Sequence, residues 1–234
     1  MMLFLIMENS LFAAEKSELN TISSRFKSAL DFIEQHINPP KINKHTTKLD
    51  AFSAQLVDAA LERTKHHVRY EASYVVIPYP NGDVPENIGV CTDEVIRAYR
   101  TIGVDLQKDV HEDMAKHFAE YPKRWGLKSP DKNIDHRRVP NLETLFKRKG
   151  KVLEISQTDA SLYHAGDVVT WKVQGLPHIG MVTDQYKNNR PMIVHNIGAG
   201  PQLEDMLFNY PITGHFRYVG AWANKNKKKT VING

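Results

Sequence analysis

One cysteine and two histidines stand where their spacing could support nucleophilic chemistry. Cys91 is the single cysteine of the chain. The residues after it have the one-sided apolar spacing of an amphipathic helix: Val95, Ile96, Tyr99 and Ile102. A thiol in the first turn of a helix lies at the positive end of the helix dipole, which favours the thiolate. A lone cysteine cannot form an internal disulfide, so we interpret Cys91 as a nucleophile, a metal ligand or a small buried side chain.

Each of the two histidines lies at one end of a β-rich run, and the two runs are neighbours in the sequence. His178 opens one run and His195 closes the next. If the runs pair as an antiparallel hairpin, both rings lie at the same end of the ladder. We predict that His178 is the base for Cys91, and that His195 orients His178. Asn196 is an alternative orienter, but adjacent strand residues point to opposite faces, so His195 is preferred.

Two further inferences concern the surroundings of Cys91. Its backbone N–H, at a helix start, could stabilise an oxyanion. Asp93 would oppose the thiolate if it pointed at the sulfur, so we expect it to face away.

Cys91, His178 and His195 could instead bind zinc together with water. The chain has no HExxH or paired CxxC motif, so the thiol interpretation is preferred and neither a metal nor another cofactor is expected.

The elements that must position these residues can be read from the apolar periodicity. Helices are expected over 17–37, 49–66, 110–120 and 142–149, and strands over 168–172, 178–183, 192–195 and 216–219. The short connections between the strands favour antiparallel neighbours. The predicted fold class is therefore α+β, with N-terminal helices packed on a mainly antiparallel sheet.

Length and composition indicate a protein with a substantial core. The chain has 234 residues, 41% of them hydrophobic, and a formal net charge of +4. Four lysines in the last twelve residues account for that excess, so 223–234 is predicted to be a basic disordered tail. Basic and aromatic residues are not interleaved, so we do not expect a nucleic-acid partner.

Several motifs resemble a known family. The segments GDVVTW at 166–171, PHIGMV at 177–182 and IVH at 193–195 resemble the second half of NlpC-type cysteine peptidases, a papain-like family. Over 78–219 the match is closer to a bacterial family, domain of unknown function 1287, through the segments PYPNGDVP, GVCTDEVIRAYR, NIDHRRVPNL, HNIGAG and GHFRYVG. The chain departs from the NlpC pattern at Val90-Cys91-Thr92-Asp93, where that family usually has Asp-Cys-Ser-Gly.

The resemblance implies a papain-like hydrolase domain over 17–222, with a helical extension at 17–66 and an insertion at 105–150. It implies Cys91, His178 and His195 as the catalytic residues. NlpC-type enzymes typically cleave peptide bonds in bacterial cell-wall stems, and relatives act as amidases or acyltransferases. The expected partner is therefore a cell-wall peptide or another amide.

Other polar residues could bind a substrate. Asp135-His136-Arg137-Arg138 could hold a carboxylate bidentately, or could be a loop whose arginines pair with nearby acids. Tyr79 and Asp83 could line the cleft or shape a turn, and Asn196 is a further candidate. These residues also support a different function, a non-catalytic module that binds an anionic ligand near Arg137 and Arg138.

The first sixteen residues are interpreted as a degenerate or truncated signal segment. Leu3–Met7 is apolar, but no lysine or arginine precedes it. With export the protein would be periplasmic or secreted, and otherwise cytoplasmic. No other stretch approaches the length of a membrane span, and the sequence leaves the oligomeric state open.

Overall fold

The computed structural model describes residue 27, residues 43–44 and residues 48–222. Every helix and strand considered below belongs to one compact unit that starts at Asn43. The possible signal segment at 1–16, the helix expected over 17–37 (apart from Lys27) and the tail at 223–234 lie outside the described residues.

The described residues contain four α-helices: α2 (Ala51–Arg63), α3 (Cys91–Thr101), α4 (Leu106–Lys116) and α5 (Val139–Lys149). Asp50 caps α2 by accepting hydrogen bonds from the N–H groups of Phe52 and Ser53. Two helices begin earlier than the sequence suggested. Asp105 caps α4 by accepting from Lys108 N–H, and Pro140 lies in the first turn of α5. Short 3₁₀ turns are η1 (Phe118–Glu120), η2 (Asp135–Arg137) and η3 (Ala160–Leu162).

An antiparallel sheet forms the other half of the protein. Its strands, in spatial order, are β4 (Lys151–Val152), β9 (Ile212–Arg217), β5 (Val168–Val173), β6 (Leu176–Lys187), β7 (Arg190–Asn196) and β8 (Pro201–Glu204), and β1 (Asn43–Lys44) also pairs with β6. A separate parallel pair joins β2 (Arg69–Tyr70) to β3 (Ile88–Gly89). The predicted α+β class with a mainly antiparallel sheet is therefore confirmed.

β9 and β8 are among the strands that differ from the sequence prediction. β9 starts at Ile212 rather than 216, because Gly214 interrupts the apolar pattern although the strand continues through it. β8 was not predicted. It follows a glycine-rich turn, starts with Pro201 and has no β-branched residue, so its extended form depends on pairing with β7.

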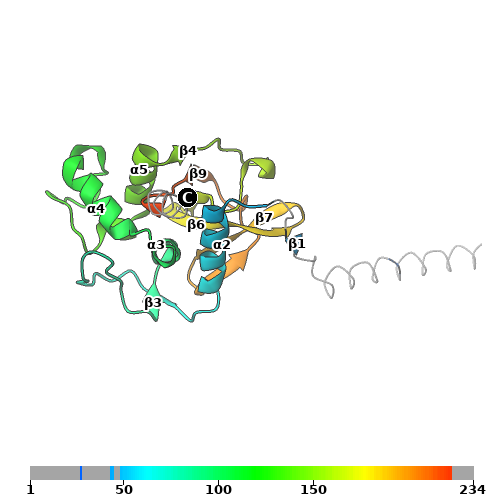
Figure 1. Ribbon diagram of the computed structural model, residues 1–234, viewed down its shortest axis with the longest axis horizontal. Helices are drawn as coiled ribbons and strands as arrows, with labels where there is room; N and C mark the ends of the chain where they lie inside the picture. Colours follow the sequence, from blue (N-terminus) through cyan, green and yellow to red (C-terminus); the bar gives the residue numbers. More distant parts are fainter. Residues whose placement is uncertain (1–26, 28–42, 45–47, 223–234) are drawn as a thin grey trace, which may run out of the picture. The chain divides into compact units, whose positions relative to one another are not determined.

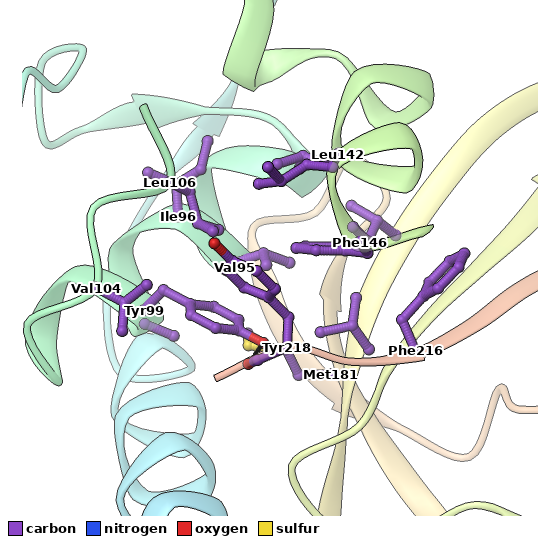
Figure 2. Close-up of a cluster of buried hydrophobic side chains, with 14 of the residues drawn as sticks. Val95, Ile96, Tyr99, Val104, Leu106, Leu142, Phe146, Met181, Phe216 and Tyr218 are labelled. Carbon is purple, nitrogen blue, oxygen red and sulfur yellow. Dashed lines mark hydrogen bonds between the residues drawn. The ribbon is translucent and has the colours of Figure 1, made fainter. Parts of the chain in front are cut away.

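Helices and sheet enclose the main core. α2 and α3 pack on each other and on β6 (Figure 1). Figure 2 shows Tyr218 between Tyr99 of α3 and Phe146 of α5, and Phe216 of β9 beside Phe146. Leu142 and Phe146 are fully buried, so the segment at 105–150 supplies part of this core. No helix among the described residues is both long and apolar enough to cross a membrane.

The opposite face of the sheet carries a second apolar cluster. Trp171 and Ile193 are fully buried there, and Met206 and Leu207 cover them. The indole N–H of Trp171 donates to the Leu207 carbonyl at 2.9 Å. The sheet is therefore buried on both faces, which restricts the hydration of polar side chains that lie within it.

Candidate functional site

Cys91 is the first residue of α3 and is 5% exposed. Its sulfur is hydrogen-bonded to the backbone N–H of Ile179 in β6 and to the hydroxyl of Tyr70 in β2. The thiol therefore lies against β6 at the residue next to His178. No spacing pattern indicated Tyr70, because β2 is two residues long and reaches Cys91 only through the tertiary fold.

The two predicted histidines are in direct contact. His178 Nε2 and His195 Nδ1 are 3.0 Å apart, and both rings are buried. Their strands pair with Gly180 opposite His195, so the two rings are diagonal neighbours on one face. A Cβ at Gly180 would come within 2.8 Å of Ile193 Cγ2 and 3.1 Å of His195 Cβ. A glycine between the rings is thus required for this close approach.

A carboxylate, that of Glu204, is in contact with the second of the two histidines. Glu204 Oε2 in β8 is 2.8 Å from His195 Nε2. The sequence prediction missed Glu204 because it missed β8. Polar alternation in Pro201-Gln202-Leu203-Glu204 is the one local signal that could have indicated this strand.

Burial determines the protonation of the thiol and its predicted base. Desolvation raises the pKa of Cys91 to about 11. Burial, followed by the neighbouring His195, lowers the pKa of His178 to about 3. The resting pair at neutral pH is therefore a thiol and a neutral imidazole. The expectation that the helix start favours the thiolate in the resting protein is corrected here.

Asp93, in the first turn of α3, forms a buried ion pair with Arg137. Arg137 Nε and Nη2 donate to the two carboxylate oxygens of Asp93 at 2.8 and 2.9 Å. Asp93 Oδ2 also accepts from Val90 N–H at 2.7 Å. Both oxygens of Asp93 are therefore hydrogen-bonded to groups other than the thiol, and its charge adds to burial in raising the pKa of Cys91. The Arg137 guanidinium further donates to the carbonyls of Ser73 and Glu71.

In the rest of the predicted anion-binding segment, Asp135 and Arg138 have partners within the protein, and His136 is buried. Asp135 is buried and accepts from Arg138 Nη1 at 3.0 Å. The Arg138 guanidinium stacks on Trp125, 4.1 Å from the ring centroid. His136 is buried, and desolvation together with Arg137 lowers its pKa to about 3. Of the two interpretations of this segment, the structure agrees with the one in which the arginines pair with nearby acids rather than with a ligand.

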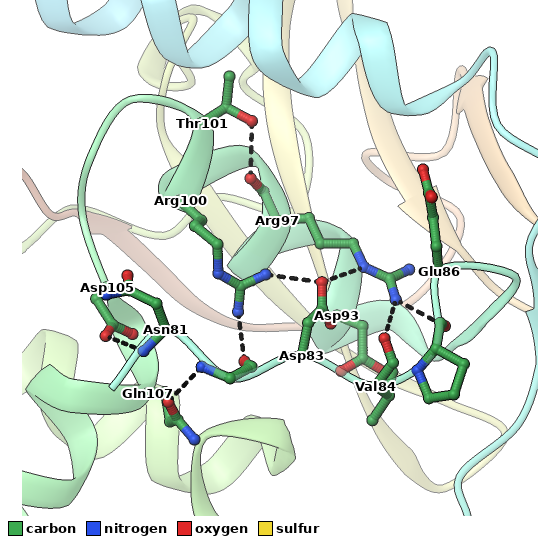
Figure 3. Close-up of polar contacts among 12 residues, drawn as sticks. Asn81, Asp83, Val84, Glu86, Asp93, Arg97, Arg100, Thr101, Asp105 and Gln107 are labelled. Atoms are coloured by element: carbon green, nitrogen blue, oxygen red, sulfur yellow. Dashed lines mark hydrogen bonds and ion pairs between the residues drawn. The ribbon is translucent and has the colours of Figure 1, made fainter. Parts of the chain in front are cut away.

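Tyr79 and Asp83 lie away from the thiol. Tyr79 packs edge-on against His111 of α4 with 4.9 Å between ring centroids. Asp83 Oδ2 accepts from Arg97 Nε at 3.1 Å and from Arg100 Nη1 at 2.8 Å, which ties the loop to α3 (Figure 3). Both residues shape the loop that precedes the helix.

Asn196 does not join the histidine pair. It is fully buried, its Oδ1 accepts from Gly198 N–H at 3.1 Å, and it follows His195 on the strand. Its side chain therefore points to the opposite face of β7. Of the two predicted orienters, the structure brings His195 to His178.

The arrangement does not fit the zinc alternative. Among the described residues, no group of three His, Cys, Asp or Glu side chains is placed to hold a metal ion. The facing nitrogens of His178 and His195 share one hydrogen bond, so their lone pairs do not converge on a common point.

These features define an α+β protein with a buried helix-start thiol against strand β6, the strand that carries one member of a buried histidine pair. A family model described as a domain of unknown function, DUF1287, matches residues 57–218, and the chain belongs to this family. The protein of Escherichia coli strain K12 called uncharacterized protein YijF is 48% identical over 190 residues, which cover 80% of this chain and 92% of that relative. The matched range includes Cys91, Tyr70, His178, His195 and Glu204.

Proposed function

We propose that this protein is a cysteine hydrolase of papain-like, NlpC-type fold that cleaves a peptide or amide bond. The observation that carries the proposal is the run of contacts from a helix-start thiol to the strand of His178, and from His178 to His195. A nucleophile, a base and an orienting group are the three parts that such catalysis needs. The chain order Cys91, His178, His195 and the motifs shared with NlpC-type peptidases support the same assignment.

The protonation states favour a mechanism in which proton transfer accompanies attack. In the resting site both groups are neutral, so Cys91 Sγ attacks the carbonyl carbon as its proton passes to His178 Nδ1. As the first residue of α3, Cys91 has no helical partner for its own N–H. In the resting protein this N–H is hydrogen-bonded to the Tyr70 hydroxyl, and in the proposed reaction it stabilises the oxyanion once the substrate oxygen takes the place of that hydroxyl. The proton on His178 then passes to the departing amine, and water hydrolyses the thioester to regenerate the thiol.

The proposed substrate is a peptide or amide of the bacterial cell wall, and the proposed location is therefore the periplasm. An acyltransferase would use the same steps, with an amine in place of water in the last one. The binding-module alternative has less support, because the Arg137 guanidinium is already hydrogen-bonded to Asp93 and to two backbone carbonyls.

Digestion of purified cell wall, followed by mass spectrometry of the muropeptides, tests activity and identifies the bond. We expect new products with the wild-type protein, none with Cys91→Ala, and a loss of at least about 100-fold with His178→Ala. His67→Ala, which removes an exposed histidine, is the matched control and should retain full activity. Undiminished products from Cys91→Ala would contradict the mechanism, and their absence with the wild type would contradict the substrate.

A further inference from the structure

Glu204 is the outermost member of a hydrogen-bonded series that runs through His195 to His178, the residue before the Ile179 N–H that contacts Cys91. Its side chain is 44% exposed, whereas that of His195 is 1% exposed. In the β7–β8 register Glu204 lies opposite Ile193, so it shares a face with His195 two residues along. The carboxylate therefore reaches the buried ring from a position near solvent.

The chemistry of the partners determines where the protons lie. A carboxylate oxygen only accepts hydrogen bonds, so the contact at 2.8 Å requires the His195 proton on Nε2. Burial lowers the pKa of His195, so the ring is neutral and its Nδ1 carries a lone pair. The contact at 3.0 Å then requires His178 Nε2 to be the donor. His178 is neutral as well, and its own Nδ1 is left with a lone pair.

We propose that Glu204 is a positioning residue that fixes the tautomers of both histidines and so leaves His178 Nδ1 as the base. In the described part of the chain, no residue hydrogen-bonds to this Nδ1. The tautomer assignment stands on the contacts alone, and its use by Cys91 rests on the proposed function. Without an acceptor at position 204, the proton of His195 could move to Nδ1. His178 would then hold its proton on the nitrogen that the thiol needs.

Nitrogen-15 NMR of protein labelled at histidine distinguishes the two neutral tautomers. Signals are assigned with His178→Gln and His195→Gln. In the wild type we expect both rings to carry the proton on Nε2. In Glu204→Lys the ammonium only donates, so both rings should carry it on Nδ1. Glu204→Gln keeps a carbonyl acceptor and should retain the wild-type tautomers. Glu62→Lys, at a carboxylate 57% exposed, is the matched control and should also retain them.

A kinetic measurement then tests whether the tautomers serve the thiol. The rate of Cys91 acylation by p-nitrophenyl acetate should fall at least about tenfold in Glu204→Lys, a part of what a general base contributes. It should stay within about threefold of the wild-type rate in Glu204→Gln and be unchanged in Glu62→Lys.

Two results would overturn the proposal: a wild-type His195 protonated on Nδ1, or unchanged tautomers in Glu204→Lys. An unchanged acylation rate despite inverted tautomers would overturn the link to Cys91. An unreactive thiol with the expected tautomers would contradict the hydrolase, while the tautomer assignment would stand.

Discussion

At the scale of single residues, burial outweighs the helix dipole at Cys91. The pKa rises from 9.0 to about 11, which corresponds to roughly 3 kcal/mol against the thiolate. A helix N-terminus contributes about 0.3–1 kcal/mol in its favour. The sulfur also accepts hydrogen bonds from Ile179 and Tyr70, which favour the thiolate but do not offset desolvation. The resting thiol is therefore neutral, and in the proposed reaction its proton must move as the sulfur attacks.

This balance predicts the pH dependence of alkylation. Because the thiolate is the reactive form, the rate of Cys91 alkylation by iodoacetamide should rise about tenfold per pH unit from pH 7 to 10, with a midpoint near 11. Mass spectrometry of the intact protein gives the rate, and a small free thiol under the same conditions gives the reference. A plateau below pH 9 would contradict the neutral resting thiol.

At the scale of elements, Arg137 fixes the start of α3. It pairs with Asp93 in the first turn, and its carbonyl accepts from Thr92 Oγ1 at 2.9 Å. The side chains of Arg137 and Asp93 are 2% and 3% exposed. A segment that the sequence suggested for ligand binding thus holds the helix that carries the thiol.

Removal of Arg137 should leave the Asp93 carboxylate buried without its partner. We expect Arg137→Ala to lower the free energy of unfolding by about 3–5 kcal/mol, measured by chemical denaturation. Arg190→Ala is the matched control, because the side chain of Arg190 in its pair with Asp205 is 39% exposed. Arg190→Ala should lower the free energy of unfolding by less than about 1 kcal/mol. Equal losses in the two variants would show that the buried pair has no special role.

At the scale of the whole molecule, the neutral buried histidines make folding sensitive to acid. The pKa values of His136 and His178 are each lowered to about 3, whereas histidines in the unfolded chain titrate near 6.5. The unfolded state therefore binds more protons between pH 6.5 and 3, so stability falls as the pH falls in this window.

From pH 6.5 to 5.5 each of these two histidines should remove about 1 kcal/mol from the free energy of unfolding. Urea denaturation at pH 7, 6.5 and 5.5 measures the change. His136→Leu should halve the pH dependence of stability that His136 and His178 contribute together. His67→Leu, at an exposed position, should leave this pH dependence unchanged. A stability that does not vary across this range would contradict the neutral state of the buried rings.

Local sequence patterns were sufficient for the parts of the fold whose signal is periodic. The amphipathic spacing after Cys91 predicted α3, and the β-rich runs bounded by His178 and His195 predicted a hairpin with both rings at one end. These features depend on the period of the apolar residues and on short connections. Both can be read from neighbouring residues alone.

Only the tertiary structure decided the partners and the protonation of the site. Glu204 and Tyr70 reach it through short strands stabilised by pairing rather than by composition. The sequence suggested that Arg137 could bind a ligand. Its actual partner, Asp93, is 44 residues away along the chain, so no local pattern joins the two. The raised pKa of Cys91 follows from burial between a helix and a sheet, which no local pattern records. The sequence by itself therefore determined which residues could react, and the packing of distant segments decided their charge and their neighbours.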